Sequence, residues 1–457
     1  MEYNYRYMRK PKTRIEKAIR LWYGTRLAVV LESILIGFMV GLVIVLFRIL
    51  LGRANTLRVW LYGTLLPGKP WYWIAGLILA LCLLGLFLGW AAKVRPMIRG
   101  SGIPQIKGVL IRELSLDWAP ELPLKFVTSV LGLGAGLSLG HEGPSVLIGA
   151  YVGMGMLTLF RRPHHERKIL FSAASAAGIS AAFNAPLAGM LFIMEEMQSS
   201  FSPLVLACSM GASMAADLAA GYFFGLKPAF NFRHITLLPI HIFPWVVLLG
   251  ILCALLGDLF KRLLYGSLDL YDTLHIPQAL RPILPLLVSI PLGFFLIDVS
   301  GGGHNLIDSL YDTNRTLRMI VLLLAVKMLF TAFSFGSGTS GGIFLPILAC
   351  GALVGSIMGK LLLGFGFIQD AQTLNFMLLG TCALFAAVFK APVTGIVLIM
   401  EMSGSFNHMV SLVLAALSAF VTTDVIASRG VYSVLLERTL RAKKRRLPGD
   451  YPGGPLR

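Results

Sequence analysis

Glu142 is the residue of this sequence whose type and setting point most directly to chemistry. It stands in the glycine-rich stretch GAGLSLGHEG at positions 134–143, which is followed by Pro144 and a long apolar run. An ionised carboxylate is expensive among apolar membrane-type segments, and carboxylates found there usually carry function. A carboxyl group can gain and lose a proton. The position of Glu142 therefore indicates proton-dependent chemistry within the apolar part of the chain.

A second pair of carboxylates ends the apolar run at 189–194, where Glu195 and Glu196 stand side by side. Neighbours on a helix point about 100° apart, so one of them can face protein while the other faces a water-accessible path. Glu401 repeats Glu195 in the second half of the sequence, but Met402 stands where Glu196 would recur. This asymmetry favours Glu196 as the less structural of the two and as a candidate for proton transfer.

The elements that must position these groups are interrupted helices. The stretch at 134–143 precedes Pro144, and GSGTSGG at 336–342 comes shortly before Pro346. Non-helical backbone inside a membrane must be buried or line a water-filled cavity, and proline suits the first turn of a helix. We therefore expect each half to hold a helix whose N-terminus lies at membrane depth, where free N–H groups and a partial positive charge form an anion site. Ionised Glu142 would occupy that site, and protonated Glu142 would leave it. The alternative is that the glycines only allow close helix packing.

The two halves of the chain resemble each other at fixed offsets. A period near 200 residues is too long for a solenoid, whereas duplicated halves with Gly/Pro-interrupted segments are typical of transporter folds. An odd number of crossings in each half would make the repeats inverted and place both termini on one side. The matches at offset 202 are Lys125/Lys327, Gly134/Gly336, Gly136/Gly338, Pro144/Pro346, Gly149/Gly351 and Gly153/Gly355, and those at offset 206 run from Phe183/Phe389 to Glu195/Glu401.

The composition requires a membrane. Of the 457 residues 56% are hydrophobic and only 14% are charged, against about 25% charged in an ordinary soluble domain, and the mean hydropathy is +0.77. The sequence therefore predicts an all-α polytopic membrane protein and excludes a disordered chain, a disulfide scaffold, a collagen and an outer-membrane barrel. The five cysteines stand singly in apolar segments, so neither a metal centre nor a cofactor is expected. The clearest spanning runs are 27–51, 71–92, 242–259, 317–335 and 409–427.

The net charge of +18 is concentrated at the two ends. Residues 1–26 carry eight Lys/Arg and two Glu, and residues 429–457 carry eight Lys/Arg, one Glu and one Asp. This distribution follows the positive-inside rule with both termini cytoplasmic, and it favours contact with an anionic leaflet over nucleic-acid binding. Within the first segment, residues 12–26 predict a short amphipathic helix at the cytoplasmic interface.

These patterns divide the chain into five parts. The membrane repeats occupy most of the sequence, and polar or basic segments flank and connect them. The predicted parts are a cytoplasmic N-terminal amphipathic segment (1–26), a first membrane repeat (27–222), a connecting loop (223–242), a second membrane repeat (243–440) and a basic cytoplasmic tail (441–457).

Three motifs, taken together, resemble the anion-binding signatures of the CLC family of chloride channels and chloride/proton antiporters. They are GSGIPQ at 100–105, GHEGP at 140–144 and GIFLP at 342–346, in the order and spacing of that family. The likeness runs from about residue 27 to 440. It implies inverted repeats with broken, re-entrant helices, a homodimer with one pathway in each subunit, and the prokaryotic type of member without regulatory domains. We therefore expect a bacterial inner membrane protein.

The resemblance also implies roles for individual residues. Glu142 matches the gating glutamate, and Glu196 matches the internal glutamate that relays protons in the exchangers. Two side chains, Ser101 and Tyr432, match those that coordinate a central chloride. Backbone groups would complete the sites: Ile343 and Phe344 at the central one, and His141, Glu142 and Gly143 at an outer one.

The sequence departs from the family pattern at a few positions. His141 stands where arginine is common, and Gln105 and Lys107 occupy positions that are acidic in some exchangers. These departures leave open how the buried charges balance and how the proton path is tuned, and they do not touch the anion ligands.

Two functions fit these residues, and a third class does not. The first is a chloride/proton antiporter, favoured because Glu142 and Glu196 are both present. The second is a passive gated chloride channel with the same anion pathway. An intramembrane enzyme would need a nucleophile–base pair or metal ligands at helical spacing, and neither HExxH nor GxSxG occurs. Chloride, protons, the lipid bilayer and a second copy of the chain are the expected partners.

Overall fold

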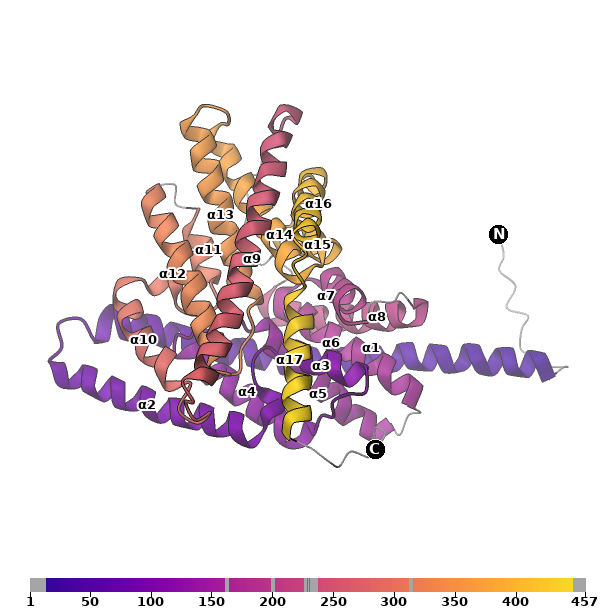
Figure 1. The fold of residues 1–457 in the computed structure, drawn as a ribbon. Coiled ribbons are helices and arrows are strands. Elements are labelled where there is room, and N and C mark those ends of the chain that lie inside the picture. The colour runs from indigo at the N-terminus through magenta and orange to yellow at the C-terminus, as the bar shows by residue number, and fades with distance from the viewer. Residues whose placement is uncertain are drawn as a thin grey trace.

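The computed structural model describes residues 14–160, 164–198, 202–225, 228, 230, 237–311 and 315–446, which fold into helices joined by short loops (Figure 1). Within these ranges no β-strand occurs, and two isolated β-bridges are the extended pairings there. The predicted all-α architecture is confirmed. Among the described residues, seven helical segments are long and apolar enough to cross a membrane: Arg26–Leu65, Trp71–Val94, Glu142–Phe160, Pro203–Phe224, Ile240–Thr273, Leu317–Gly336 and Phe344–Gly364.

The helices follow one order twice. In the first half the helices are α1 (Arg14–Trp60), α2 (Trp71–Val94), α3 (Ile103–Leu110), α4 (Trp118–Gly134), α5 (Glu142–Phe160), α6 (His164–Phe183), α7 (Pro186–Phe192) and α8 (Pro203–Phe224). The same succession of long and short helices recurs as α9 (Phe243–Thr273), α10 (Ile283–Phe295), α11 (His304–Ser309), α12 (Leu317–Gly336), α13 (Phe344–Gly364), α14 (Thr373–Phe389), α15 (Pro392–Ser403) and α16 (Met409–Val425). One further helix, α17 (Val431–Arg446), follows the second set.

Short non-α turns complete the helical segments. The π-helical turns are η1 (Leu61–Leu65) and η3 (Ile193–Gln198), and η3 continues α7. The 3-10 turns are η2 (Pro96–Ile98), η4 (Ile240–Ile242), η5 (Ile297–Val299) and η6 (Asp370–Gln372). Turns η2 and η5 precede α3 and α11, so they also belong to the repeated order.

The breaks between helices have the same local cause in both halves. After α6 and α14 the chain turns at a residue in the left-handed conformation, Asn184 (φ 54°) and Lys390 (φ 57°). Two residues later Pro186 and Pro392 begin α7 and α15. Proline is tolerated there because the first helical N–H has no partner within the helix. The chain can therefore end one helix and start another inside the fold.

The repeated glycines divide into two roles. Gly149 and Gly351 lie where helices touch, because a Cβ atom at either position would come within 2.5 Å of a carbonyl oxygen, that of Ala174 or of Gly380. Such glycines allow close helix packing, which is the alternative interpretation of the glycine-rich pattern. Gly136 (φ 106°) and Gly338 (φ 76°) instead adopt left-handed backbone in the loops that follow α4 and α12. For these two the loop conformation itself requires glycine.

Two fully buried lysines hold equivalent loops. Lys125 in α4 and Lys327 in α12 have exposed fractions of 0%. Each ammonium donates to two carbonyls of the loop in front of a short helix: Ile98 O (3.0 Å) and Gly100 O (2.7 Å) for Lys125, and Val299 O (2.9 Å) and Gly301 O (2.7 Å) for Lys327. A buried cation that donates to carbonyl oxygens fixes the geometry of the loop. An apolar side chain at the same position could not make these hydrogen bonds. The pair found at offset 202 is thus a pair of equivalent loop anchors.

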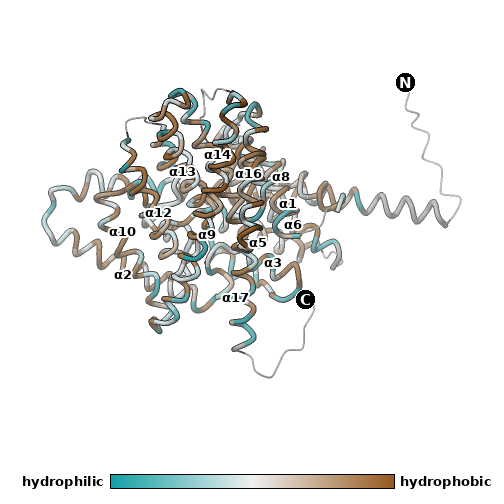
Figure 2. Tube along the Cα trace, turned by 45° about the horizontal axis from the view of Figure 1, so that its top comes forward, coloured by the Kyte–Doolittle hydropathy of each residue, from teal (hydrophilic) through white to brown (hydrophobic). Residues whose placement is uncertain are grey.

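Hydrophobic residues predominate along much of the long helices (Figure 2), and many of these apolar residues are exposed. A soluble protein rarely exposes so large an apolar surface, so this surface fits contact with lipid. Trp71, Leu79 and Leu83 on α2 and Leu255 on α9 are among the exposed residues.

Some predicted boundaries differ from the observed helices. Helix α1 runs without interruption from Arg14 to Trp60, so the short helix predicted at 12–26 is not a separate element; positions 12 and 13 lie outside the described residues. The run predicted at 409–427 forms α16, which has only 17 residues. The end of the predicted basic tail, 447–457, and a large part of the predicted connecting loop (226, 227, 229 and 231–236) also lie outside the described residues.

Candidate functional site: the junction of the broken helices

The three sequence motifs, which are far apart along the chain, meet in one place. Gly140 and Gly342 exchange both backbone hydrogen bonds, each with an N–O distance of 2.7 Å. Gly100 bridges to Ser340, and its carbonyl accepts from Gly341 N at 3.0 Å. These bridges are the two isolated β-pairings of the described residues. They join the loops before α3, α5 and α13 into one unit.

Helix N-termini converge around this unit. Helices α3, α5 and α13 begin directly after the bridged loops, at Ile103, Glu142 and Phe344. The loops approach so closely that a Cβ atom at Gly143 would lie 2.8 Å from the carbonyl oxygen of Ser101. Each helix start carries N–H groups without a partner in its own helix and a partial positive charge. The arrangement therefore suits an anion, as the broken segments predict.

Two buried hydroxyl groups belong to this junction. Ser101 and Tyr432 have exposed fractions of 1% and 0%. In the described part of the chain, the hydroxyl of Tyr432 has no hydrogen-bond partner, and Ser101 Oγ makes one hydrogen bond, accepted from Ile103 N at 3.4 Å. Both hydroxyls can therefore donate to an anion. They do so without a fixed positive charge, which suits an ion that must bind and leave again.

An aromatic cluster connects Tyr432 to the start of α13. The Tyr432 ring stacks on Phe389 with centroids 5.0 Å apart, and Phe389 stacks on Phe344 at 5.3 Å. Phe192 lies edge-on to both Phe344 and Tyr432. The first residue of α17 is Val431, so the cluster holds the start of α17 against the junction. Phe389 and Phe192 were not predicted as site residues, although Phe389 belongs to the repeated motif at offset 206.

The carboxylate of Glu142 reaches from one repeat to the other. Glu142 is fully buried, and its Oε2 accepts a hydrogen bond from Leu345 N at 3.4 Å, in the first turn of α13. Its Oε1 lies 3.3 Å from Nδ1 of His141 and makes no hydrogen bond with the described residues. A carboxylate of the first repeat thus lies on the helix N-terminus of the second, at the position where an anion would bind.

Two cavities border residues of the junction. One cavity, of about 280 Å³, is lined by His141 and Leu345 and by the cations Arg48 and Arg58. The other, of about 790 Å³, is lined by Ser101, with Arg99, Arg281, Arg438 and Arg441 among its remaining lining residues. Cationic side chains near an opening raise the local concentration of anions, which the arginines of the first cavity favour. In the second cavity Arg281 and Arg438 are paired with carboxylates.

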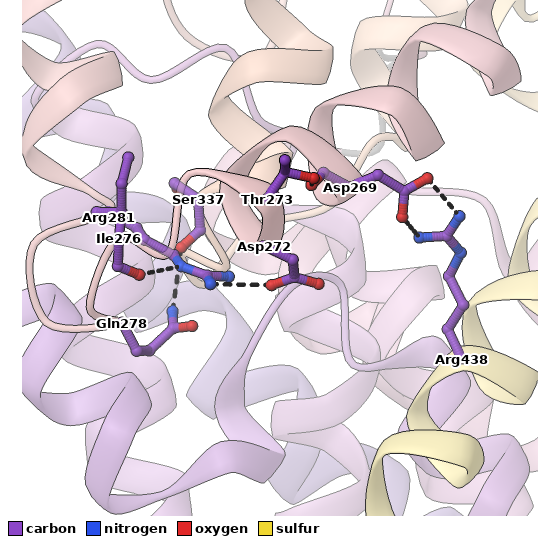
Figure 3. A network of polar contacts seen from close by, with 8 residues as sticks. All are labelled: Asp269, Asp272, Thr273, Ile276, Gln278, Arg281, Ser337 and Arg438. Carbon is purple, nitrogen blue, oxygen red and sulfur yellow. Dashed lines mark hydrogen bonds and ion pairs between the residues drawn. The ribbon is translucent and has the colours of Figure 1, made fainter.

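A network of ion pairs and hydrogen bonds links residues at the second cavity (Figure 3). The guanidinium of Arg438 in α17 donates to both carboxylate oxygens of Asp269 in α9, at 2.7 and 3.1 Å. Three residues further along α9, Asp272 accepts from Arg281 at 2.9 Å, and nearby Gln278 donates to the carbonyl of Ser337 at 3.1 Å. The contacts join α17 to α9, and the loop before α13 to the segment that follows α9.

The neighbouring carboxylates Glu195 and Glu196 have different surroundings. Glu195 accepts hydrogen bonds from Val393 N (3.2 Å) and from Thr394 N and Oγ1 (2.7 Å each), at the start of α15. In return, Glu401 of α15 accepts from the first backbone N–H groups of α7. The two repeats therefore cap each other's helices, a role that the duplication at offset 206 could have revealed.

Glu196 is buried and pairs with a cation instead. Its Oε1 lies 2.7 Å from Nζ of Lys107, and the exposed fractions of these side chains are 8% and 14%. The same Nζ lies 3.2 Å from the hydroxyl of Ser433, the residue after Tyr432. Lys107 was noticed in the sequence only as a departure from the family pattern, and its partner could not be predicted from spacing.

The fold and the junction define an integral membrane protein built from repeated, interrupted helices that meet at a buried site suited to an anion. The chain belongs to the CLC family: the model of the family described as "Voltage gated chloride channel" matches residues 84–424.

Curated relatives carry names that state an activity. The "H(+)/Cl(-) exchange transporter ClcA" of Cronobacter sakazakii is 34% identical over 381 residues, which cover 81% of this chain and 81% of the relative. The transporter of the same name from Citrobacter koseri is 33% identical and covers 91% of this chain and 89% of its own length.

Solved structures agree with the fold. A slow cyanobacterial Cl⁻/H⁺ antiporter superposes with a TM-score of 0.85 at 29% identity, covering 91% of this chain and 99% of the other. A CLC-type fluoride/proton antiporter reaches 0.74 at 22% identity, covering 92% and 98%, and supports the fold alone.

Proposed function

We propose that this protein exchanges chloride for protons across a membrane, with Glu142 as the gate and Glu196 as the inner proton acceptor. The observation that carries the proposal is the hydrogen bond from Leu345 N to the Glu142 carboxylate, which lies among helix N-termini. The names of the relatives and of the similar solved structure describe the same exchange.

The gate works through competition for one position. Ionised Glu142 takes the place of an anion at the N-terminus of α13, where N–H groups and the helix dipole favour negative charge. When Glu142 gains a proton, this attraction is lost and a chloride ion can enter. Each opening therefore requires a proton, and each return of the ionised carboxylate displaces the anion. This alternation links the two ions without a large movement of the fold.

The central chloride would be held by hydroxyl and backbone donors. Ser101 and Tyr432 supply the hydroxyls, and the N–H groups of Ile343 and Phe344 complete the central site. At the outer site the backbone of His141, Glu142 and Gly143 lies along the path. Several moderate donors in series let an anion lose water and still leave, whereas a lysine within the site would hold it.

The protein is an integral membrane protein, and we place it in the bacterial inner membrane with both termini cytoplasmic and with membrane repeats at 27–222 and 243–440. The basic residues at both ends support this orientation. A second copy of the chain is the expected partner, each copy holding its own pathway. Exposed apolar side chains on α8 and α16 offer surface for such a contact, Leu218 and Val421 among them.

The test is a paired measurement of chloride and proton fluxes from liposomes that hold the purified protein. A chloride gradient should drive protons uphill in the wild type. Glu196→Gln should stop proton movement and keep chloride flux, and Glu142→Ala should leave chloride flux that no longer depends on pH. Glu113→Gln, which changes an exposed carboxylate, is the matched control and should behave as wild type.

The alternative function is a passive chloride channel, and the same flux measurement distinguishes it from an exchanger. Chloride flux with no proton movement in the wild type, whatever the gradient, would contradict the exchange and leave a chloride channel. Unchanged coupling in Glu196→Gln would remove Glu196 from the proton path.

A further inference from the structure

A half-buried lysine faces the proposed inner proton acceptor. The ammonium of Lys107 contacts both Glu196, at 2.7 Å, and Ser433, at 3.2 Å. Both charged side chains are largely withdrawn from water, with exposed fractions of 14% for Lys107 and 8% for Glu196. Opposite charges in such a place attract each other much more strongly, and are screened much less by salt, than on a protein surface.

The pair joins the elements that carry the proposed chloride ligands. Lys107 lies in α3, the helix that follows Ser101, and Ser433 directly follows Tyr432 in α17. Glu196 lies in η3, which continues α7. The ammonium therefore stands where the inner proton acceptor and the two hydroxyl-bearing segments come together.

Few other titratable groups surround Glu196. Glu195, the adjacent residue, is turned to α15 and accepts three hydrogen bonds there. Helix α17 contributes Tyr432, helix α7 contains no titratable residue, and those of α6 all lie at 164–168 in its first turn. Lys107 is the one residue that forms an ion pair or hydrogen bond with the Glu196 carboxylate in the described ranges.

We propose that Lys107 is a positioning residue for proton transfer, which holds Glu196 as a carboxylate and sets the pH at which Glu196 takes up a proton. The inference rests on the proposed exchange of chloride for protons. When a proton from water adds to the carboxylate, Glu196 becomes a neutral acid and the Lys107 ammonium keeps its charge without a counter-ion. Every entering proton must therefore be bound against this attraction. The flexible stem of lysine lets the ammonium move away and return.

The test compares the pH dependence of coupled transport in three variants. Proton flux driven by a chloride gradient is measured in liposomes that start at equal pH on both sides. Lys107→Met should move the midpoint of the pH profile to higher pH by about one to three units, because an opposite charge within hydrogen-bonding distance changes the protonation of a carboxylate by that amount. Lys107→Arg keeps the charge and should return the midpoint close to that of wild type. Lys443→Met removes another cation, which lies in α17 and whose Nζ donates to the carbonyl of Glu113, and should leave the midpoint unchanged.

A purely structural ion pair gives a different result. It would lower flux at every pH in Lys107→Met without moving the midpoint, and that outcome overturns the proposal. The double variant Lys107→Met/Glu196→Gln is an internal check. Its pH profile of chloride flux should equal that of Glu196→Gln, because the group on which Lys107 acts is gone. A shifted profile in the double variant also contradicts the proposal.

The wild-type measurement distinguishes failure of the proposed exchange from failure of the proposed role of Lys107. If wild type moves no protons, the proposed exchange fails, and the role of Lys107 fails with it. If wild type is coupled and Glu196→Gln is not, but the midpoint of Lys107→Met stays in place, only the role of Lys107 is lost.

Discussion

Glu195 and Glu401 should behave as a matched pair of structural caps that can be weakened without loss of ion coupling. Glu195 accepts three hydrogen bonds at the start of α15, and Glu401 accepts two at the start of α7. Replacing either residue by Gln keeps the shape of the side chain. The amide turns an NH₂ donor toward a backbone N–H, so at least one hydrogen bond is lost and the others become neutral.

The magnitude follows from the number and type of these bonds. A hydrogen bond to a charged group contributes roughly 1.5–3 kcal/mol, and a neutral one about 0.5–1.5 kcal/mol. Glu195→Gln should therefore lower the free energy of unfolding by about 3.5–6 kcal/mol, and Glu401→Gln by about 2.5–4.5 kcal/mol. With an unfolding entropy of about 2.1 cal/mol/K per residue, a chain of this length should lose about 4–6 °C in Tm in Glu195→Gln and about 3–5 °C in Glu401→Gln.

The assay combines thermal unfolding in detergent with paired flux measurements. Because large proteins often unfold irreversibly, apparent Tm values are compared at one scan rate. Both variants should melt earlier than wild type while keeping the ratio of chloride to protons, whereas Glu196→Gln should lose proton movement. An unchanged Tm with lost coupling in Glu195→Gln would refute the assignment of roles to the two neighbouring carboxylates.

Further predictions concern the anion site. Tyr432→Phe removes a hydroxyl donor but keeps the stacking on Phe389. Chloride affinity measured by calorimetry should fall about 10- to 150-fold, as expected for one hydrogen bond to an ion of roughly 1.5–3 kcal/mol, with Tm unchanged; an unchanged affinity would remove that hydroxyl from the site. Gly143→Ala would place a Cβ 2.8 Å from the carbonyl oxygen of Ser101 and should abolish chloride binding; a variant that binds normally would show that the loops are not held as described. Glu142→Ala should bind chloride at least as tightly as wild type, since the competing carboxylate is gone, and weaker binding would contradict competition.

The broken helices could be predicted from the sequence because their cause is local. A glycine-rich stretch before proline fixes where a helix can start, and the repetition of 134–143 at 336–342 showed that this happens twice. The convergence of the two starts is observed in the bridge between Gly140 and Gly342. The pairing of these glycines depends on how the repeats pack against each other, so spacing along the chain could suggest that they meet but not how.

Contacts between distant side chains were harder to predict. The roles of Glu195 and Glu196 could be separated because Met402 breaks the repeat at one of the two positions. Lys107 has no such marker: its ion pair with Glu196 depends on where α3 lies relative to η3, which neither composition nor periodicity determines. The uninterrupted α1 was missed for a related reason, because a basic amphipathic segment and the start of a long helix have the same local pattern.

The convergence of helix N-termini on one anion is tested most directly by diffraction from crystals grown with bromide. Anomalous density should appear within hydrogen-bonding distance of both the Ser101 and the Tyr432 hydroxyls, and Glu142→Ala should add a peak where the carboxylate lies against Leu345 N. Crystals soaked at high bromide that show no peak at either position would contradict an anion site built from these helices.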